Sequence, residues 1–121
     1  MKTIIHSKNE NTIVEIIDDG IILKNVQDFL DIAANIQSRT LLFHKENIVP
    51  EFFDLKTKIA GDILQKASNY RIRIGIIGEF ENIKRKSLSD FIYESNKTGE
   101  VLFKESIEEV IEQFSKQEKL S

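Results

Sequence analysis

The sequence has 121 residues, of which 40% are hydrophobic and 31% are charged, a balance typical of a chain that folds around one core. Its 17 basic and 20 acidic residues give a net charge of −3, which excludes the strong basic excess of a typical DNA-binding domain. The chain contains no cysteine, so disulfides, thiolate metal sites and cysteine nucleophiles are excluded. We expect one domain over residues 1–121, with a frayed polar tail at 116–121.

No apolar run is long enough to span a membrane, and the first residues lack the apolar stretch of a signal peptide. We therefore expect a cytoplasmic protein that contacts neither a membrane nor nucleic acid.

The first half of the chain alternates between strand and helix patterns. Two β-branched runs at 3–6 and 12–17 predict a β-hairpin. Asn25 is a favoured N-cap, and apolar residues at helical spacing predict a helix over 26–37. A buried strand at 40–43 is followed by a second apolar helical stripe. That helix begins either with Pro50 at its first position or with Asp54 as its N-cap after a tighter turn.

The second half repeats this alternation. Residues 71–77 predict a central strand covered on both faces, and residues 101–103 predict a last strand. Ser87 is the expected N-cap of the third helix, and Ser106 begins a capping box for the fourth. Gly61 inside the second helix predicts a close approach to the sheet. The order β-β-α-β-α-β-α-β-α indicates an α/β fold with a mixed sheet of about five strands.

The stretch from Phe43 through Pro50 to Thr57 resembles a bacterial family known as domain of unknown function 4180. The same holds for 59–66, 69–71 and 86–97, so the resemblance covers nearly the whole chain. The order of elements is in addition similar to that of STAS domains, the anti-sigma-factor-antagonist fold. The STAS resemblance implies a regulatory, protein-interaction module, whereas the first family implies no activity.

Polar residues follow two parallel strands where ligands of open α/β sheets bind. One loop carries His44, Lys45, Glu46 and Asn47, and the other carries Glu79. A facing His44–Glu79 pair would provide acid–base chemistry near neutral pH. The favoured interpretation is a loop-bonded histidine and a solvated glutamate, because no catalytic spacing is present.

Asp54, Lys56 and Thr57 lie at the start of the second helix, where a lysine and a hydroxyl could hold a phosphate or carboxylate. The simpler interpretation, with Asp54 as an N-cap and Lys56 in solvent, is favoured because aspartate is a preferred cap. The STAS resemblance implies Thr57 as a regulatory hydroxyl, although the usual Asp-Ser-Ser-Gly-like motif is missing.

Two further clusters each have two interpretations. Lys84, Arg85, Lys86 and Ser87 form either an anion site at a helix start or a solvated basic turn, and the turn is favoured.

The second cluster also has two interpretations: Glu94, Ser95 and Asn96 form a buried hydrogen-bond network with a loop, or Tyr93, Glu94 and Asn96 form a partner-binding ridge anchored by Tyr93. These two interpretations stay open.

No nucleotide-binding, hydrolase or metal-binding motif is present, and the only histidines are His6 and His44. We therefore predict no catalytic residue, no metal and no cofactor. The absence of a catalytic motif favours a non-enzymatic regulatory or protein-interaction module with a protein partner. The alternative is a small-molecule-binding protein or minor enzyme that uses the crevice at the carboxyl ends of the strands. A homodimer is compatible with either, formed through an edge strand of the hairpin or through an apolar patch near Phe52 and Phe53.

Overall fold

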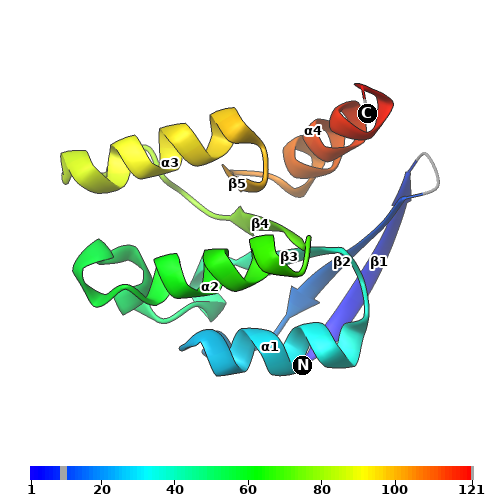
Figure 1. Cartoon of the computed structure of the whole chain (residues 1–121), viewed down its shortest axis with the longest axis horizontal. Helices are drawn as coiled ribbons and strands as arrows, with labels where there is room; N and C mark the ends of the chain where they lie inside the picture. Colours follow the sequence, from blue (N-terminus) through cyan, green and yellow to red (C-terminus); the bar gives the residue numbers. More distant parts are fainter. Residues whose placement is uncertain (9–10, 121) are drawn as a thin grey trace.

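The computed structural model of the chain describes residues 1–8 and 11–120, and it confirms the α/β fold with a five-stranded mixed sheet (Figure 1). The elements are β1 (Lys2–Lys8), β2 (Asn11–Ile17), α1 (Val26–Ile36), β3 (Thr40–His44), α2 (Ile59–Asn69), β4 (Arg73–Ile77), α3 (Lys86–Thr98), β5 (Val101–Lys104) and α4 (Ile107–Leu120).

The strands lie in sequence order, β1-β2-β3-β4-β5. The hairpin partner β1 is antiparallel to β2, and the other neighbouring pairs are parallel. Because each crossover is right-handed and moves the chain one strand in the same direction, α1, α2 and α3 lie on one face of the sheet. The carboxyl ends of β2 to β5 therefore meet at a single edge.

Alternation along the strands divides the core in two. On the first face, Leu41, Phe43, Ile74 and Ile76 pack with buried residues of α1, α2 and α3. On the second face, Leu42, Ile77 and Leu102 pack with Val110 and Phe114 of α4. The central strand β4 is thus covered on both faces, as its apolar sequence predicts.

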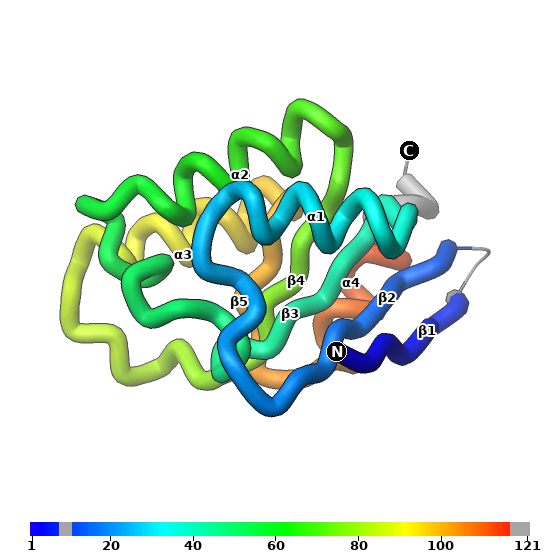
Figure 2. The backbone as a smooth tube through the Cα atoms, turned by 90° about the horizontal axis from the view of Figure 1, so that it is seen from below, coloured from blue at the N-terminus to red at the C-terminus, as the bar shows by residue number. Residues whose placement is uncertain are grey.

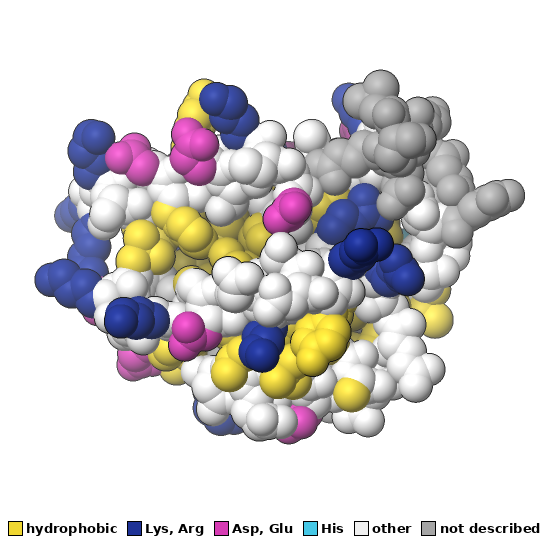
Figure 3. All heavy atoms as spheres, viewed as in Figure 1, with side chains coloured by type: hydrophobic (Ala, Val, Ile, Leu, Met, Phe, Trp, Pro, Cys, Tyr) yellow, Lys and Arg dark blue, Asp and Glu magenta, His cyan; other side chains and the backbone are white. Residues whose placement is uncertain are grey.

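Hydrophobic side chains are visible between α2 and α3 in the space-filling view (Figure 3). Lys and Arg side chains gather at the end of the molecule where α3 begins. No helix in the described part of the chain is both long enough and apolar enough to cross a membrane. The predicted tail at 116–121 begins inside α4, whose helical backbone extends to Leu120, and Ser121 lies outside the described residues.

Helix starts follow local capping contacts. The Asn25 side chain accepts a hydrogen bond from the Asp28 amide at 2.9 Å, as predicted for the start of α1. The Glu109 amide donates to the Ser106 hydroxyl at 3.3 Å, which confirms the cap of α4.

The start of α3 differs from the prediction, because α3 begins at Lys86 with Arg85 at the cap position. Ser87 is therefore inside the helix and is not its N-cap.

The second helix also starts later than predicted. Two 3₁₀ turns, Pro50–Phe53 and Leu55–Thr57, precede it, and α2 begins at Ile59 after Lys58 adopts a left-handed φ of 67°. Asp54 caps the second of these turns by accepting from the Lys56 amide at 3.2 Å. The apolar stripe from Phe52 onward therefore belongs to three short helical segments.

The prediction that Gly61 approaches the sheet is wrong. Gly61 is exposed, and a Cβ there would meet nothing within 4 Å. The close approach occurs at Gly75 in β4, where a Cβ would lie 2.6 Å from both a Leu42 methyl and a Val110 methyl. α4 therefore packs on the sheet directly over a residue without a side chain.

These two glycines predict opposite effects of the same substitution. Gly61→Ala should raise the free energy of unfolding by about 1 kcal/mol, because alanine is the better helix former. Gly75→Ala should lower it by about 1–3 kcal/mol, because the added methyl group overpacks the core under α4. Urea unfolding of both variants checks this, and a stabilising Gly75→Ala would contradict the packing of α4 on β4.

Candidate functional site

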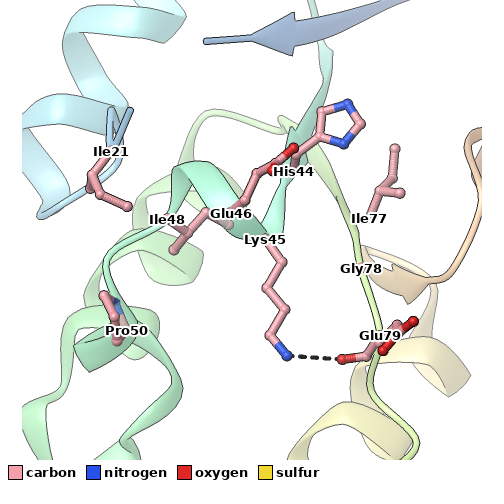
Figure 4. Close-up of a pocket in the computed structure, with 9 residues that line it drawn as sticks. All are labelled: Ile21, His44, Lys45, Glu46, Ile48, Pro50, Ile77, Gly78 and Glu79. Carbon is pink, nitrogen blue, oxygen red and sulfur yellow. Dashed lines mark hydrogen bonds between the residues drawn. The ribbon is translucent and has the colours of Figure 1, made fainter. Parts of the chain in front are cut away.

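The crevice predicted at the carboxyl ends of the strands exists. In the register of β3 with β4, His44 lies opposite Ile77, so the loops that follow these strands begin side by side. A cleft of about 570 Å³ opens between them (Figure 4). Its lining residues are Ile21, His44, Lys45, Glu46, Ile48, Pro50, Ile77, Gly78 and Glu79. Three of the four residues predicted in the first loop, and Glu79 of the second, are therefore brought together here.

His44 and Lys45 leave the end of β3 in opposite directions (Figure 4). The Lys45 ammonium donates to the Glu79 carbonyl oxygen at 2.9 Å and lies 5.6 Å and 5.1 Å from the ring centres of Phe53 and Phe80. These cation–π contacts and the hydrogen bond hold the lysine across the mouth of the cleft. Gly78 makes this path available, since a Cβ there would be 2.6 Å from the Lys45 Cβ.

The hydrogen-bond partner of His44 is Glu15. The His44 Nε2 lies 2.7 Å from one Glu15 carboxylate oxygen, and the His6 Nε2 lies 2.9 Å from the other. The Glu15 side chain is only 4% exposed, whereas the two histidines are 22% and 27% exposed. Both histidines of the chain therefore cover one carboxylate, and the pair considered between His44 and Glu79, which was not the favoured interpretation, is replaced by a pair between His44 and Glu15.

The hydrogen bonds to Glu15 determine the roles of Nε2 and Nδ1 in each imidazole. A carboxylate accepts hydrogen bonds, so each imidazole donates through Nε2 and its Nδ1 is left to accept or to take up a proton. Burial raises the pKa of Glu15, but the hydrogen bonds and charges of His6 and His44 outweigh this effect and hold the pKa below 4.5. Glu15 is therefore an ionised carboxylate that orients two imidazoles.

Sequence reasoning missed Glu15 and His6. The available signal was a single carboxylate within the buried apolar run from Ile13 to Ile17 of β2. A charged residue at such a position is nearly always paired. Its partners could not be identified without the register, because His44 is 29 residues away and lies on another strand.

Asn47 has a structural role in the loop. It is buried, and its side-chain amide donates to the carbonyl oxygens of Asp18 and Gly20 at 2.8 Å each. The backbone carbonyl oxygen of Asn47 accepts from the backbone amides of Ile22 and Leu23. Asn47 thereby folds the segment after β2 against the loop after β3, and it does not line the cleft.

Thr57 is exposed, and its hydroxyl lies 2.8 Å from the carbonyl oxygens of both Glu51 and Asp54. It also accepts from the Ile59 amide at 3.3 Å, so it helps to start α2. Asp54 acts as a cap, as the favoured interpretation predicts. The alternative interpretation, an anion site at the start of the second helix, does not match the position of Asp54, Lys56 and Thr57, because α2 begins beyond them.

Two further hollows adjoin the cleft. The second has a volume of about 270 Å³ and is lined by Lys45, Ile48, Pro50, Phe53, Phe80, Ile83 and Leu88. The third has a volume of about 230 Å³ and is lined by Phe53, Asp54, Leu55, Lys56, Arg85, Ser87 and Leu88. Neighbouring hollows share lining residues, so the three lie in a row, which we call the carboxyl-edge groove. It joins the His44–Glu46 loop to the segment from Asp54 to Lys56.

The basic cluster is largely paired with carboxylates. Arg85 contacts Asp54 at 3.3 Å, and Lys86 contacts Asp90 at 3.1 Å. Both ion pairs are solvent-exposed, and Ser87 lines the third hollow. The cluster therefore forms one wall of the carboxyl-edge groove and not a closed anion pocket.

The residues at the end of α3 separate into two roles. The Asn96 amide donates to the Phe103 carbonyl oxygen at 3.2 Å and accepts from the Phe103 amide at 2.7 Å, as the network interpretation predicts. Glu94 is exposed, and Tyr93 is 66% exposed. Asn96 therefore belongs to the sheet edge, while Tyr93 and Glu94 face solvent.

Among residues 1–8 and 11–120, no group of three or more histidine, aspartate or glutamate side chains is arranged to hold a metal ion.

Because the Glu15 carboxylate is paired with two histidines, we expect its contribution to the free energy of unfolding to be lost at acid pH. Glu15→Gln should lower the free energy of unfolding by about 1–3 kcal/mol near pH 7, because the glutamine amide cannot accept from both imidazoles. In the native chain, the contribution of the carboxylate is present above pH 4.5 and is lost as the pH falls through the lowered pKa of Glu15.

Unfolding curves measured across this pH range check both statements. The matched control is Glu94→Gln, which changes an exposed glutamate on α3 and should leave stability within about 0.5 kcal/mol. Equal effects of the two substitutions would contradict the pairing of Glu15 with the histidines.

Comparison with known proteins gives one match. Neither the curated proteins nor the solved structures contain a match to this chain. A family model described as domain of unknown function (DUF4180) matches residues 8–114, which is most of the chain. The chain therefore belongs to the DUF4180 family.

Proposed function

We propose that this domain is a non-enzymatic regulatory module that binds an extended segment of a partner protein in the carboxyl-edge groove. The observation that carries this proposal is the row of three adjoining hollows: the first and second share Lys45, Ile48 and Pro50, and the second and third share Phe53 and Leu88. A row of hollows suits an extended chain segment better than it suits a compact ligand. The order of strands and helices, similar to that of STAS domains, supports a regulatory role of this kind.

The apolar middle of the groove selects for an apolar anchor. Phe53, Phe80, Ile83 and Leu88 surround the second hollow, whose volume of about 270 Å³ is large enough for a leucine or phenylalanine side chain. These side chains are half-buried, so covering them with an anchor would remove apolar surface from water. A buried anchor in such a hollow is the usual energetic centre of an interface.

The charges beside the third hollow indicate the rest of the partner segment. The net charge of the chain is −3, yet the charged residues that line this hollow are two cations, Lys56 and Arg85, and one carboxylate, Asp54, and Lys84 and Lys86 flank Arg85 in the sequence. The same end of the molecule shows gathered Lys and Arg side chains in Figure 3. The complementary segment therefore carries aspartate or glutamate next to its apolar anchor.

Selection from a random peptide library displayed on phage tests this proposal. Peptides that bind the immobilised domain should share an apolar residue flanked by aspartate or glutamate. A synthetic copy of the selected peptide should bind Leu88→Asp and Lys56→Glu at least about tenfold more weakly, a loss of about 1.4 kcal/mol.

The matched control is Lys97→Glu, which makes the same charge change on an exposed residue of α3 outside the groove. It should retain the wild-type affinity. Failure to enrich any peptide, or equal affinity of the selected peptide for the groove variants and the wild type, would refute the proposal.

A second candidate function is the binding of a small ionised molecule in the first hollow. The specific observation is that Glu15 orients His44 while Lys45 and Glu79 line the same cleft of about 570 Å³. Such a site supplies a cation, an anion and an oriented imidazole to a ligand.

A library of small carboxylates and phosphates, screened by protein NMR, tests this second candidate. Binding should shift the amide signals of His44, Gly78 and Glu79, and His44→Gln should weaken it. Shifts confined to residues outside the cleft, or no shifts at millimolar ligand, would exclude it.

A further inference from the structure

The two edges of the sheet are protected differently. At the β5 edge, the Asn96 side chain bonds both the amide and the carbonyl of Phe103. The carbonyls of Glu100 and Lys104 bond instead to amides of the β4 side, Ile74 and Gly78, so the Phe103 peptide groups face outward. One side chain thus occupies the place that a further strand would take, and it closes this edge to pairing.

The outer edge of β1 has no comparable cap. This strand is seven residues long, contains neither proline nor glycine, and lies at the rim of the molecule beside β2 (Figure 2). Within the described part of the chain, no side chain outside β1 bonds to the backbone of Lys2–Ser7. A strand of this length with unpaired peptide groups is a template for pairing with another chain.

The centre of β1 is also unusually apolar for an exposed edge. Ile4 is 44% exposed and Ile5 is 66% exposed, and as neighbours they point to opposite faces of the sheet. Ile5 lines a hollow of about 400 Å³ together with Val14 of β2 and Ile36 of α1. Both faces at this edge therefore present apolar surface that a further strand would cover.

We propose that β1 pairs with β1 of a second copy of this chain, antiparallel and about a two-fold axis, so that one sheet runs through both copies. A two-fold pairing of identical strands is self-complementary and satisfies both edges at once. The same pairing also removes the exposed side chains of Ile4 and Ile5 in each copy from solvent. The dimer leaves the carboxyl-edge groove free, because no residue of β1 lines the three hollows.

The charged residues of β1 favour one register of its pairing with β1 of the second copy. A pairing centred on Ile5 would place Lys2 directly opposite Lys8 of the second copy, and like charges opposite each other destabilise a strand pair. A pairing centred on Ile4 places Ile4 opposite Ile4, and it places Lys2 opposite His6 of the second copy. Because His6 is bonded to the Glu15 carboxylate, the lysine then lies near a negative charge. We assign the Ile4-centred register on this basis.

Sedimentation and light scattering between about 1 µM and about 1 mM, the range of weak to moderate affinity, test the dimer. The wild-type chain should pass from monomer to dimer within this range. Ile5→Lys should weaken the dimer at least about tenfold, while Tyr93→Lys, which changes an equally exposed residue on α3, should not. A wild-type chain that stays monomeric at about 1 mM, or a dimer unaffected by Ile5→Lys, would overturn the proposal.

Because the chain has no cysteine, single cysteines report the register directly. Under mild oxidation, folded Ile4→Cys should form a disulfide-linked dimer, since its two copies lie opposite each other within disulfide reach. Ile5→Cys faces Thr3 of the second copy and should cross-link much more slowly. Faster cross-linking of Ile5→Cys would refute the Ile4-centred register, and slow cross-linking of both would refute pairing through β1.

Discussion

The buried carboxylate of Glu15 links three strands of the sheet through its side-chain contacts. It lies on β2 and bonds to His6 of β1 on one side and to His44 of β3 on the other. An uncompensated charge at this position would be strongly destabilising, so the two histidines are required wherever Glu15 is ionised. This requirement fixes the rotamer of His44 at the start of the cleft and ties the hairpin strand β1 to the rest of the sheet.

The same strand end also separates the two surfaces of the molecule. His44 turns toward the Glu15 side of the sheet, while Lys45, the next residue, turns toward Phe53 and Phe80. Strand β3 ends at His44 and Lys45 begins a 3₁₀ turn, so these two neighbouring side chains leave the backbone in different directions. His44 thus belongs both to the histidine cluster and to the first hollow of the carboxyl-edge groove, while Lys45 extends to the apolar second hollow.

Much of the fold was predictable because its signals are local. The apolar run of β4, the cap at Asn25 and the capping box at Ser106 depend on residues within a few positions of one another. The start of α2 was not predictable in the same way. Asp54 is a good cap, but it caps a 3₁₀ turn, and the left-handed Lys58 delays the helix to Ile59.

The position of the candidate site could be predicted from the sequence, but its side-chain contacts could not. The carboxyl ends of parallel strands must meet, and this placed His44, Lys45, Glu46 and Glu79 at one cleft. Which carboxylate would bond to His44 depends on strand order and register, and these follow from packing across the whole sheet. A glutamate in an apolar strand signals a buried partner, yet the sequence alone does not say on which strand that partner lies.

The two proposed interactions use different edges of the sheet, and Glu15 contacts a histidine at each of them. β1 is held to β2 by the strand ladder and by the His6 contact, so the edge offered to a second copy depends in part on this carboxylate. The groove depends on the same group through His44. Dimerisation would further shield His6 and Glu15 from water, and shielding strengthens a charged hydrogen bond that is already paired. The histidine cluster is therefore shared by the strand edge proposed for the dimer, through His6, and by the cleft, through His44.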